Sequence, residues 1–231
     1  MTAVVKTFDR PHALERLLTS ISRVYPTLRV IVVDDGKVAA RCRLPNVRVV
    51  RLPFDVGVSV GRNTGVSELE TPLFVTLDDD FVLTTNCGLE HVVALMRTHS
   101  ELDIIGGEVL TLPTFRRDVR VENRDVFGGQ SGRPTKVGGL PIYDRVSNFF
   151  IGRTARVASI GWDPKLKRLD HTDFFLRAHG QLLVAFDERF SCLHAMTPFD
   201  VDYMRYRRDI ACDEAYLATK WEDPTHVTGG S

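Results

Sequence analysis

The sequence contains few cysteines and lacks the spacings that cysteine-based sites need. Its four cysteines are scattered and form no CxxC pair: Cys42, Cys87, Cys192 and Cys212. This pattern argues against a structural zinc site and against a small disulfide-rich scaffold. We expect reduced thiols and a cytoplasmic protein. A lumenal location would require that an N-terminal membrane anchor had been removed.

The chain also lacks net charge and long apolar runs. Thirty basic residues balance thirty acidic ones, so no overall field favours nucleic acid or an anionic membrane as the main partner. No run of 18 apolar residues is present, so we expect no transmembrane segment, and the first residues read as a core strand rather than a secretion signal. A hydrophobic fraction of 43% is ordinary for a globular protein.

Strand-like and helix-like segments alternate over the first half of the chain. We expect strands at residues 3–6, 29–33, 47–52, 73–77 and 104–110, and helices at 10–24, 58–69 and 89–96. Asp9 is the expected N-cap of the first helix, with Pro11 at its first position. Because the strands are almost continuously apolar, the pattern predicts an α/β fold with a mostly parallel sheet flanked by helices.

The second half is less regular. Residues 113–145 show no sustained period, and we expect short hairpins there, with the glycine-rich stretch 127–140 either a lid over the site or a segment without function. The expected elements that follow are strands at 146–151, 182–186 and 190–194, and helices at 154–159, 171–179 and 201–219. No internal repeat or linker divides residues 1–231, so we expect one domain.

Polar side chains follow three of the expected strands. Thr7 ends the first strand, Asp34 and Asp35 end the second, and the triplet Asp78-Asp79-Asp80 closes an apolar run. In open parallel sheets, ligands bind at the carboxyl ends of strands near a reversal of strand order. A solvated acidic turn explains the triplet alone, but three such strand ends together favour a binding site.

Clustered carboxylates repel one another, so a positive partner should lie near the triplet. Mg²⁺ or Mn²⁺ held by carboxylates and phosphate oxygens is the simplest candidate. Arg62 lies near the start of an expected helix and suits a phosphate, although a surface arginine would fit its position equally well. His194 ends a late strand, where it is either a metal ligand or an ordinary core histidine.

The ordered segments resemble the GT-A glycosyltransferases of family two, and the later ones are similar to ganglioside-type β-1,4-N-acetylgalactosaminyltransferases. The resemblance covers roughly residues 4–195. It rests on Val5-Lys6-Thr7-Phe8, Val33-Asp34-Asp35-Gly36, Gly57-x-x-x-Gly61-Arg62-Asn63, Leu77-Asp78-Asp79-Asp80, Val146-Ser147-Asn148-Phe149-Phe150, Gly161-Trp162-Asp163-Pro164, His171-Thr172-Asp173-Phe174-Phe175-Leu176 and His194-Ala195.

The resemblance implies an inverting, metal-dependent transfer of a sugar, such as N-acetylgalactosamine or another hexose, from a UDP-sugar to a carbohydrate or lipid-linked acceptor. Residues 1–110 would bind the nucleotide-sugar and residues 111–231 the acceptor. The implied nucleotide-sugar ligands are Thr7, Asp34, Asp35, Arg62, Asp78 and Asp79. The implied ligands of Mn²⁺ or Mg²⁺ are Asp78, Asp80 and His194.

The resemblance places the catalytic base at Asp173, with Asp170 as the fallback beside His171. Asp173 departs from the glutamate of the ganglioside-type pattern and is one methylene shorter. Trp162 and Asn148 are the implied acceptor contacts, although core packing is an equally good explanation of the tryptophan.

Two other functions remain open. Nucleotidyltransferases also bind a nucleotide and a metal on an α/β sheet, but they usually begin with a glycine-rich phosphate loop, and Thr7-Phe8-Asp9-Arg10 contains no glycine. A non-catalytic carbohydrate-binding module on the same fold is the second alternative. The intact acidic triplet, Arg62, Asp173 and His194 weigh against it.

Overall fold

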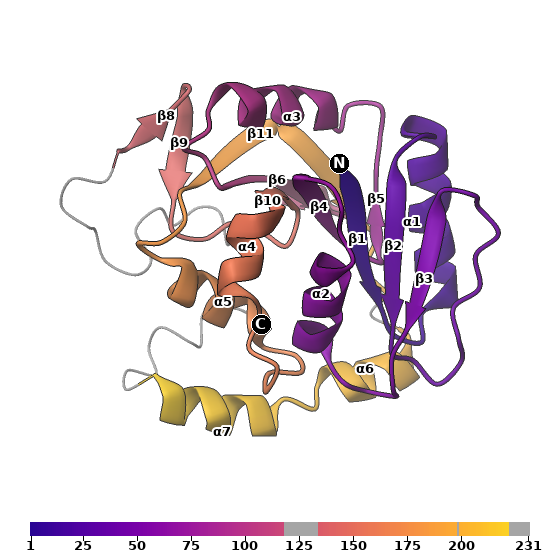
Figure 1. Ribbon diagram of the computed structural model, residues 1–231. Coiled ribbons are helices and arrows are strands. Elements are labelled where there is room, and N and C mark those ends of the chain that lie inside the picture. Colours follow the sequence, from indigo (N-terminus) through magenta and orange to yellow (C-terminus); the bar gives the residue numbers. More distant parts are fainter. Residues whose placement is uncertain (118–133, 198, 222–231) are drawn as a thin grey trace.

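The computed structural model describes residues 1–117, 134–197 and 199–221 and contains the expected mostly parallel sheet flanked by helices (Figure 1). The strands are β1 (Thr2–Thr7), β2 (Arg29–Asp34), β3 (Val47–Arg51), β4 (Leu73–Asp78), β5 (Phe81–Val82), β6 (Ile104–Thr111), β7 (Arg116–Arg117), β8 (Lys136–Val137), β9 (Leu140–Tyr143), β10 (Phe150–Arg153) and β11 (Val184–His194). The helices are α1 (Pro11–Val24), α2 (Val58–Ser67), α3 (Leu89–Thr98), α4 (Thr154–Ile160), α5 (Asp170–Ala178), α6 (Val201–Arg207) and α7 (Ala211–Lys220).

The strand order is β3-β2-β1-β4-β10-β6-β11-β9-β8, with β5 on β11 and β7 on β6. Strands β1 to β4 are mutually parallel, as are β6 and β11, while β10 runs antiparallel between β4 and β6. The chain leaves β1 on one side for β2 and returns on the other as β4. The strand order therefore reverses between β1 and β4, which is where such sheets form a ligand crevice.

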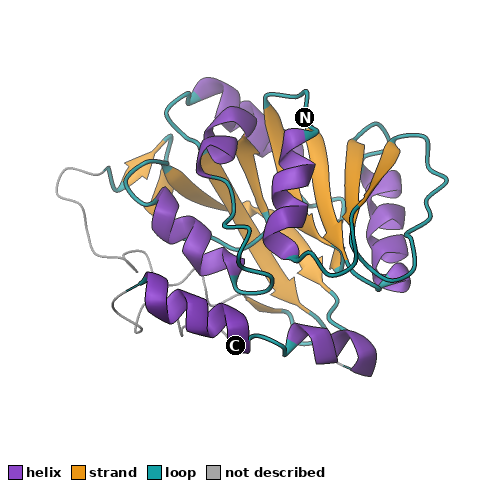
Figure 2. Ribbon diagram, turned by 60° about the horizontal axis from the view of Figure 1, so that its bottom comes forward, coloured by secondary structure: helices purple, strands orange, loops and turns teal. Residues whose placement is uncertain are grey.

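Two apolar cores cover the two faces of the sheet. In β1, Ala3 and Val5 pack with α1 and α3 on one face, while Val4 packs on the other face with residues of α2, α4 and α5. Figure 2 shows the sheet between these helical layers. The α6–α7 segment belongs to neither layer and lies below the ends of the strands in Figure 1. The sheet thus fixes the strand ends, and α6 approaches them from outside.

Several expected boundaries are wrong in instructive ways. Asp9 does not cap α1, because its carboxylate accepts hydrogen bonds from the backbone N–H groups of Lys37 and Val38. The two strands expected at 182–186 and 190–194 form the single strand β11, whose pairing shifts register between Asp187 and Ser191. The expected strand at 146–151 begins only at Phe150, while a β8–β9 hairpin confirms the expected short hairpins. Half of the stretch 127–140, residues 127–133, lies outside the described residues.

None of the four cysteines forms a disulfide, and no helix in the described part of the chain is long and apolar enough to cross a membrane. Burial raises the pKa of the Cys87 thiol to about 12, whereas Cys212 is exposed. Because the thiolate is the reactive form, we expect a maleimide at pH 8 to label Cys212 first and Cys87 only after unfolding. Mass spectrometry of peptides from native and urea-treated protein measures this; rapid native labelling of Cys87 would contradict the packing described here.

Candidate active site

The ends of β1, β2 and β4 bring together the polar residues that the sequence singled out. In the sheet register, Thr7 lies beside Asp34 of β2, and Lys6 lies beside Asp78 of β4. The Thr7 hydroxyl donates a 2.7 Å hydrogen bond to the Asp79 carboxylate. Thr7 and the acidic triplet therefore share the crevice where the strand order reverses.

The three aspartates of the triplet differ in how far they are exposed to solvent. The Asp78 side chain is 34% exposed, whereas Asp79 and Asp80 are buried. Burial raises the pKa of Asp79 to about 6, against the opposing effect of Arg10. Burial would also raise the pKa of Asp80, but hydrogen bonds and charge from His194 and Arg10 outweigh it and hold that pKa below its usual range. The structure thus favours the ionised form of Asp80.

His194 lies at the end of β11, which pairs there with β5 directly after the triplet. Its Nε2 atom is 3.3 Å from Oδ2 of Asp80. No group of three acidic, histidine or cysteine side chains converges among the described residues. One carboxylate and one imidazole nonetheless suit Mn²⁺ or Mg²⁺, because such ions complete their shell with water and substrate phosphate.

Arg62 of α2 connects the triplet to α5. It donates to Asp78 at 3.1 Å and forms an ion pair with Asp170, the first residue of α5. Burial raises the pKa of Asp170, opposed by the Arg62 charge and reinforced by Asp78. The arginine therefore holds a buried carboxylate of α5 against the open end of the triplet.

Asp34 and Asp35 lie at the end of β2 and are almost fully buried. Asp34 accepts hydrogen bonds from the backbone of Gly36 and Ala40 and pairs with Arg51 at 2.6 Å. Asp35 forms an ion pair with Lys6 and accepts a 2.9 Å hydrogen bond from the Gly57 N–H group. Both carboxylates already organise the loops around the crevice.

Gly57 joins Asp35 to the loop before α5. It has φ +98°, and a Cβ atom there would lie 2.6 Å from the backbone of Lys167. Gly57→Ala should therefore lower the free energy of unfolding by about 1–3 kcal/mol, the range for a strained backbone residue. Urea titration measures this change. Gly139 also has a positive φ, but a Cβ atom there would have no neighbouring atom within 4 Å, so Gly139→Ala separates the effect of the steric clash from that of backbone strain. Equal losses in both variants would contradict the close approach.

Asp173 lies one turn into α5 and is 1% exposed. One carboxylate oxygen accepts from Arg177 at 2.9 Å. The other accepts from Lys220 at 2.6 Å and from the indole N–H of Trp221 at 3.1 Å. Asp173 is thus the point at which the C-terminal helix α7 attaches to α5.

The remaining predicted residues lie on the α5 side. His171 is hydrogen-bonded through Nδ1 to Asn148 at 2.5 Å. Trp162 is 4% exposed and stacks on Phe174 with ring centroids 4.7 Å apart. Trp162 therefore packs in the core, which was the alternative to its predicted role as an acceptor contact.

Sequence patterns assigned no site role to Lys6, Arg10, Tyr203 or Asp213. Arg10 pairs with Asp79 and Asp80, and Tyr203 of α6 stacks on it. The Asp213 carboxylate of α7 accepts from three consecutive backbone N–H groups, those of residues 167–169 just before Asp170. The available sequence signal was a charged residue inside the first apolar strand for Lys6 and a charged residue shortly after that strand for Arg10.

Comparison with known proteins places this chain in a family. The profile described as "Glycosyl transferase family 2" matches residues 2–157. Human beta-1,4 N-acetylgalactosaminyltransferase 1 is 35% identical over 239 residues, covering 94% of this chain and 45% of the human protein. The mouse beta-1,4 N-acetylgalactosaminyltransferase 2 is 33% identical, covering 80% of this chain and 37% of that protein. The chain spans less than half the length of these curated relatives.

Solved structures agree on the fold. Staphylococcus aureus TarS 1–349 in complex with UDP-GlcNAc superposes with a TM-score of 0.63 at 16% identity, covering 85% of this chain and 58% of that one. A longer TarS structure gives a TM-score of 0.62 at 17% identity, covering 89% and 38% of the two chains. At this identity the likeness concerns the GT-A architecture.

Proposed function

The chain belongs to glycosyltransferase family 2, and we propose that it transfers N-acetylgalactosamine from UDP to a hydroxyl group of a carbohydrate or lipid-linked acceptor, with inversion at the anomeric carbon. The chain is a glycosyltransferase that uses a nucleotide-sugar. The choice of sugar follows the activity for which the relatives are named. UDP follows the ligands named for TarS, where UDP and UDP-GlcNAc are bound.

One observation carries the proposal: Thr7, the acidic triplet and His194 meet at the reversal of strand order. The residues that would hold a divalent cation are Asp80 and His194, with Asp78 near the open side. When bound, such an ion would act as a Lewis acid that offsets the charge on the departing diphosphate. Arg62 would add a fixed positive charge beside Asp78.

The acceptor hydroxyl needs a base. Asp170 and Asp173 are both buried, but three hydrogen bonds tie Asp173 to Arg177 and to the end of α7. Asp170 instead faces the triplet through Arg62, and burial raises its pKa, so it holds a proton more readily than an ordinary aspartate does. We therefore assign the base to Asp170 and a structural role to Asp173, reversing the preference that the sequence pattern suggested.

The transfer is a single displacement at the anomeric carbon. The acceptor O–H bond breaks as its oxygen attacks the anomeric carbon, and the proton passes to the Asp170 carboxylate. The bond between that carbon and the diphosphate oxygen breaks on the opposite face, and UDP leaves with the electron pair. Exclusion of water from a buried base favours transfer to the acceptor over hydrolysis.

A donor screen tests the proposal. Release of the nucleoside diphosphate is measured with MnCl₂ and a panel of carbohydrate and lipid-linked acceptors: UDP from UDP-N-acetylgalactosamine, UDP-N-acetylglucosamine, UDP-galactose and UDP-glucose, and GDP from GDP-mannose. We expect acceptor-dependent release to be greatest with UDP-N-acetylgalactosamine. Preference for another UDP-sugar would overturn the sugar assignment, and absence of UDP binding with and without Mn²⁺ would favour the carbohydrate-binding module.

A further inference from the structure

Arg10 occupies an unusual position for a residue at the start of a helix. It directly precedes α1, and its guanidinium lies between two carboxylates of the triplet. One terminal nitrogen donates to Asp80 at 2.7 Å, and the other pairs with Asp79. The side chain is only 9% exposed. A single buried guanidinium therefore neutralises much of the charge of the triplet.

An aromatic ring from α6 covers the same guanidinium. The Arg10 Cζ atom lies 3.9 Å from the ring centroid of Tyr203, close enough for a cation–π contact. Asp200 caps α6 by accepting a 3.0 Å hydrogen bond from the Tyr203 N–H group. The position of Arg10 is thus coupled to the C-terminal segment, which is outside the sheet core.

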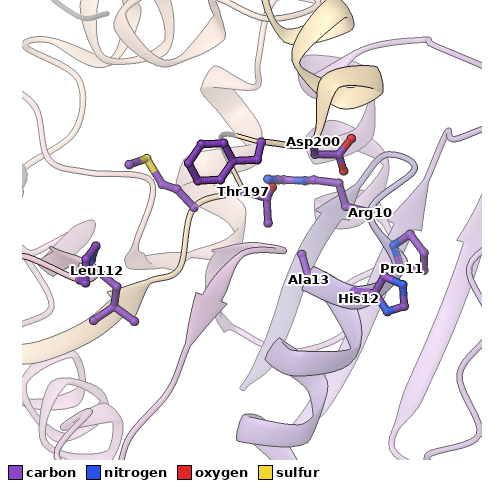
Figure 3. A pocket seen from close by; sticks show the side chains of 10 residues that line it. Arg10, Pro11, His12, Ala13, Leu112, Thr197 and Asp200 are labelled. Atoms are coloured by element: carbon purple, nitrogen blue, oxygen red, sulfur yellow. The ribbon is translucent and has the colours of Figure 1, made fainter.

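In this conformation one hydrogen-bond donor of Arg10 has no acceptor among the described residues. Its Nε atom is buried and has no hydrogen-bond partner among the described residues. The side chain also lines an apolar hollow of about 500 Å³ together with Pro11, Ala13, Leu112, Met196 and Phe199 (Figure 3). The hollow gives the arginine space to turn without displacing packed core residues, and an unpaired buried donor favours a second arrangement.

Arg10 and His194 approach the same oxygen of Asp80, at 2.7 Å and 3.3 Å. A divalent cation held by Asp80 and His194 would therefore repel the guanidinium at close range. The arginine cannot remain in this pose beside such an ion without a further negative charge. A diphosphate supplies that charge, and guanidinium binds phosphate through paired hydrogen bonds.

We propose that Arg10 is the internal counter-cation of the acidic triplet and that its guanidinium turns from Asp80 to the donor diphosphate when the metal–nucleotide complex binds. The inference rests on the proposed function, because it requires a diphosphate at this crevice. It makes Arg10 a competitor of the metal when no nucleotide is present and a ligand of the nucleotide when the metal is present. The binding of metal and nucleotide is therefore coupled through one side chain.

Binding measurements on Arg10→Gln test this directly, with Mn²⁺ alone followed by electron paramagnetic resonance and UDP binding followed by calorimetry. We expect the variant to bind free Mn²⁺ roughly ten-fold more tightly and to bind UDP with Mn²⁺ roughly ten-fold more weakly. A ten-fold change in affinity is about the contribution of one hydrogen bond to a charged group. Arg23→Gln, at an exposed arginine of the same helix, should change neither constant. Unchanged or weaker binding of free Mn²⁺ by Arg10→Gln would overturn the proposal.

Tyr203→Leu gives a second route if loss of Arg10 impairs folding. It keeps the arginine but removes the ring, so free Mn²⁺ should bind several-fold more tightly because the guanidinium is less firmly held. No change would count against the proposal. Failure of the wild-type protein to bind UDP with Mn²⁺ would instead refute the proposed function, whereas normal binding without the Arg10 effect would refute this inference alone.

Discussion

Asp80→Asn should lower kcat by about 10²–10³-fold, the usual cost of removing one fixed group that stabilises charge in the transition state. Asp80 is the carboxylate that the structure keeps ionised, through His194 and Arg10. The amide has no negative charge, so it binds a divalent cation poorly and no longer balances the guanidinium. Steady-state release of UDP from UDP-N-acetylgalactosamine measures the effect.

Asp209→Asn is the matched control, since it makes the same chemical change at an exposed aspartate after α6. Its kcat should remain within about two-fold of wild type, because surface substitutions rarely matter. Thermal unfolding of both variants checks that the fold persists. Asp80→Asn with near-normal kcat would show that the triplet does not hold the reacting diphosphate.

The second large effect separates the two carboxylates of α5. Asp170→Asn should reduce kcat by about 10²–10⁴-fold, as expected for loss of a general base, in addition to the stability lost with its buried ion pair to Arg62. Asp173→Asn should chiefly lower the free energy of unfolding, by about 2 kcal/mol, because it weakens the charged hydrogen bonds to Arg177 within α5 and to Lys220 at the end of α7. The two substitutions are chemically identical and lie one helical turn apart.

The pH dependence sharpens this comparison. Burial raises the pKa of Asp170 above its usual range, so the base is protonated, and inactive, at a higher pH than an ordinary aspartate. The acidic limb of kcat in the wild type should therefore lie above the usual aspartate pKa of about 4 and should vanish in Asp170→Asn. A large loss of kcat in Asp173→Asn, with the acidic limb retained in Asp170→Asn, would restore Asp173 as the base.

The parts of the site that follow from local sequence were predictable. Continuous apolar strands ending in Thr7, Asp34 and the triplet predict a parallel sheet, and parallel strands bring their carboxyl ends to one edge. His194 was also placed correctly at a strand end, although periodicity split its long strand in two because of the register shift after Asp187. Helix α1 began where Pro11 predicted it.

The partners of each charged group were not predictable, because they come from distant segments. The ion pair between Arg62 and Asp170 joins residues 108 positions apart, and Lys220 reaches Asp173 from a helix that sequence patterns left without a role. Asp9 illustrates the same limit, since a cap residue by local rules serves the loop after β2 instead. Local propensity identifies which groups carry charge, whereas tertiary packing decides what each one neutralises.

A crystal soaked with UDP and MnCl₂, with anomalous data collected at the manganese edge, tests the central claim most directly. We predict one manganese peak in contact with Asp80 and His194, with the diphosphate beside it and the uridine toward Thr7. The anomalous signal identifies the ion without reference to activity. Manganese and diphosphate bound together at any other place on the molecule would contradict the account.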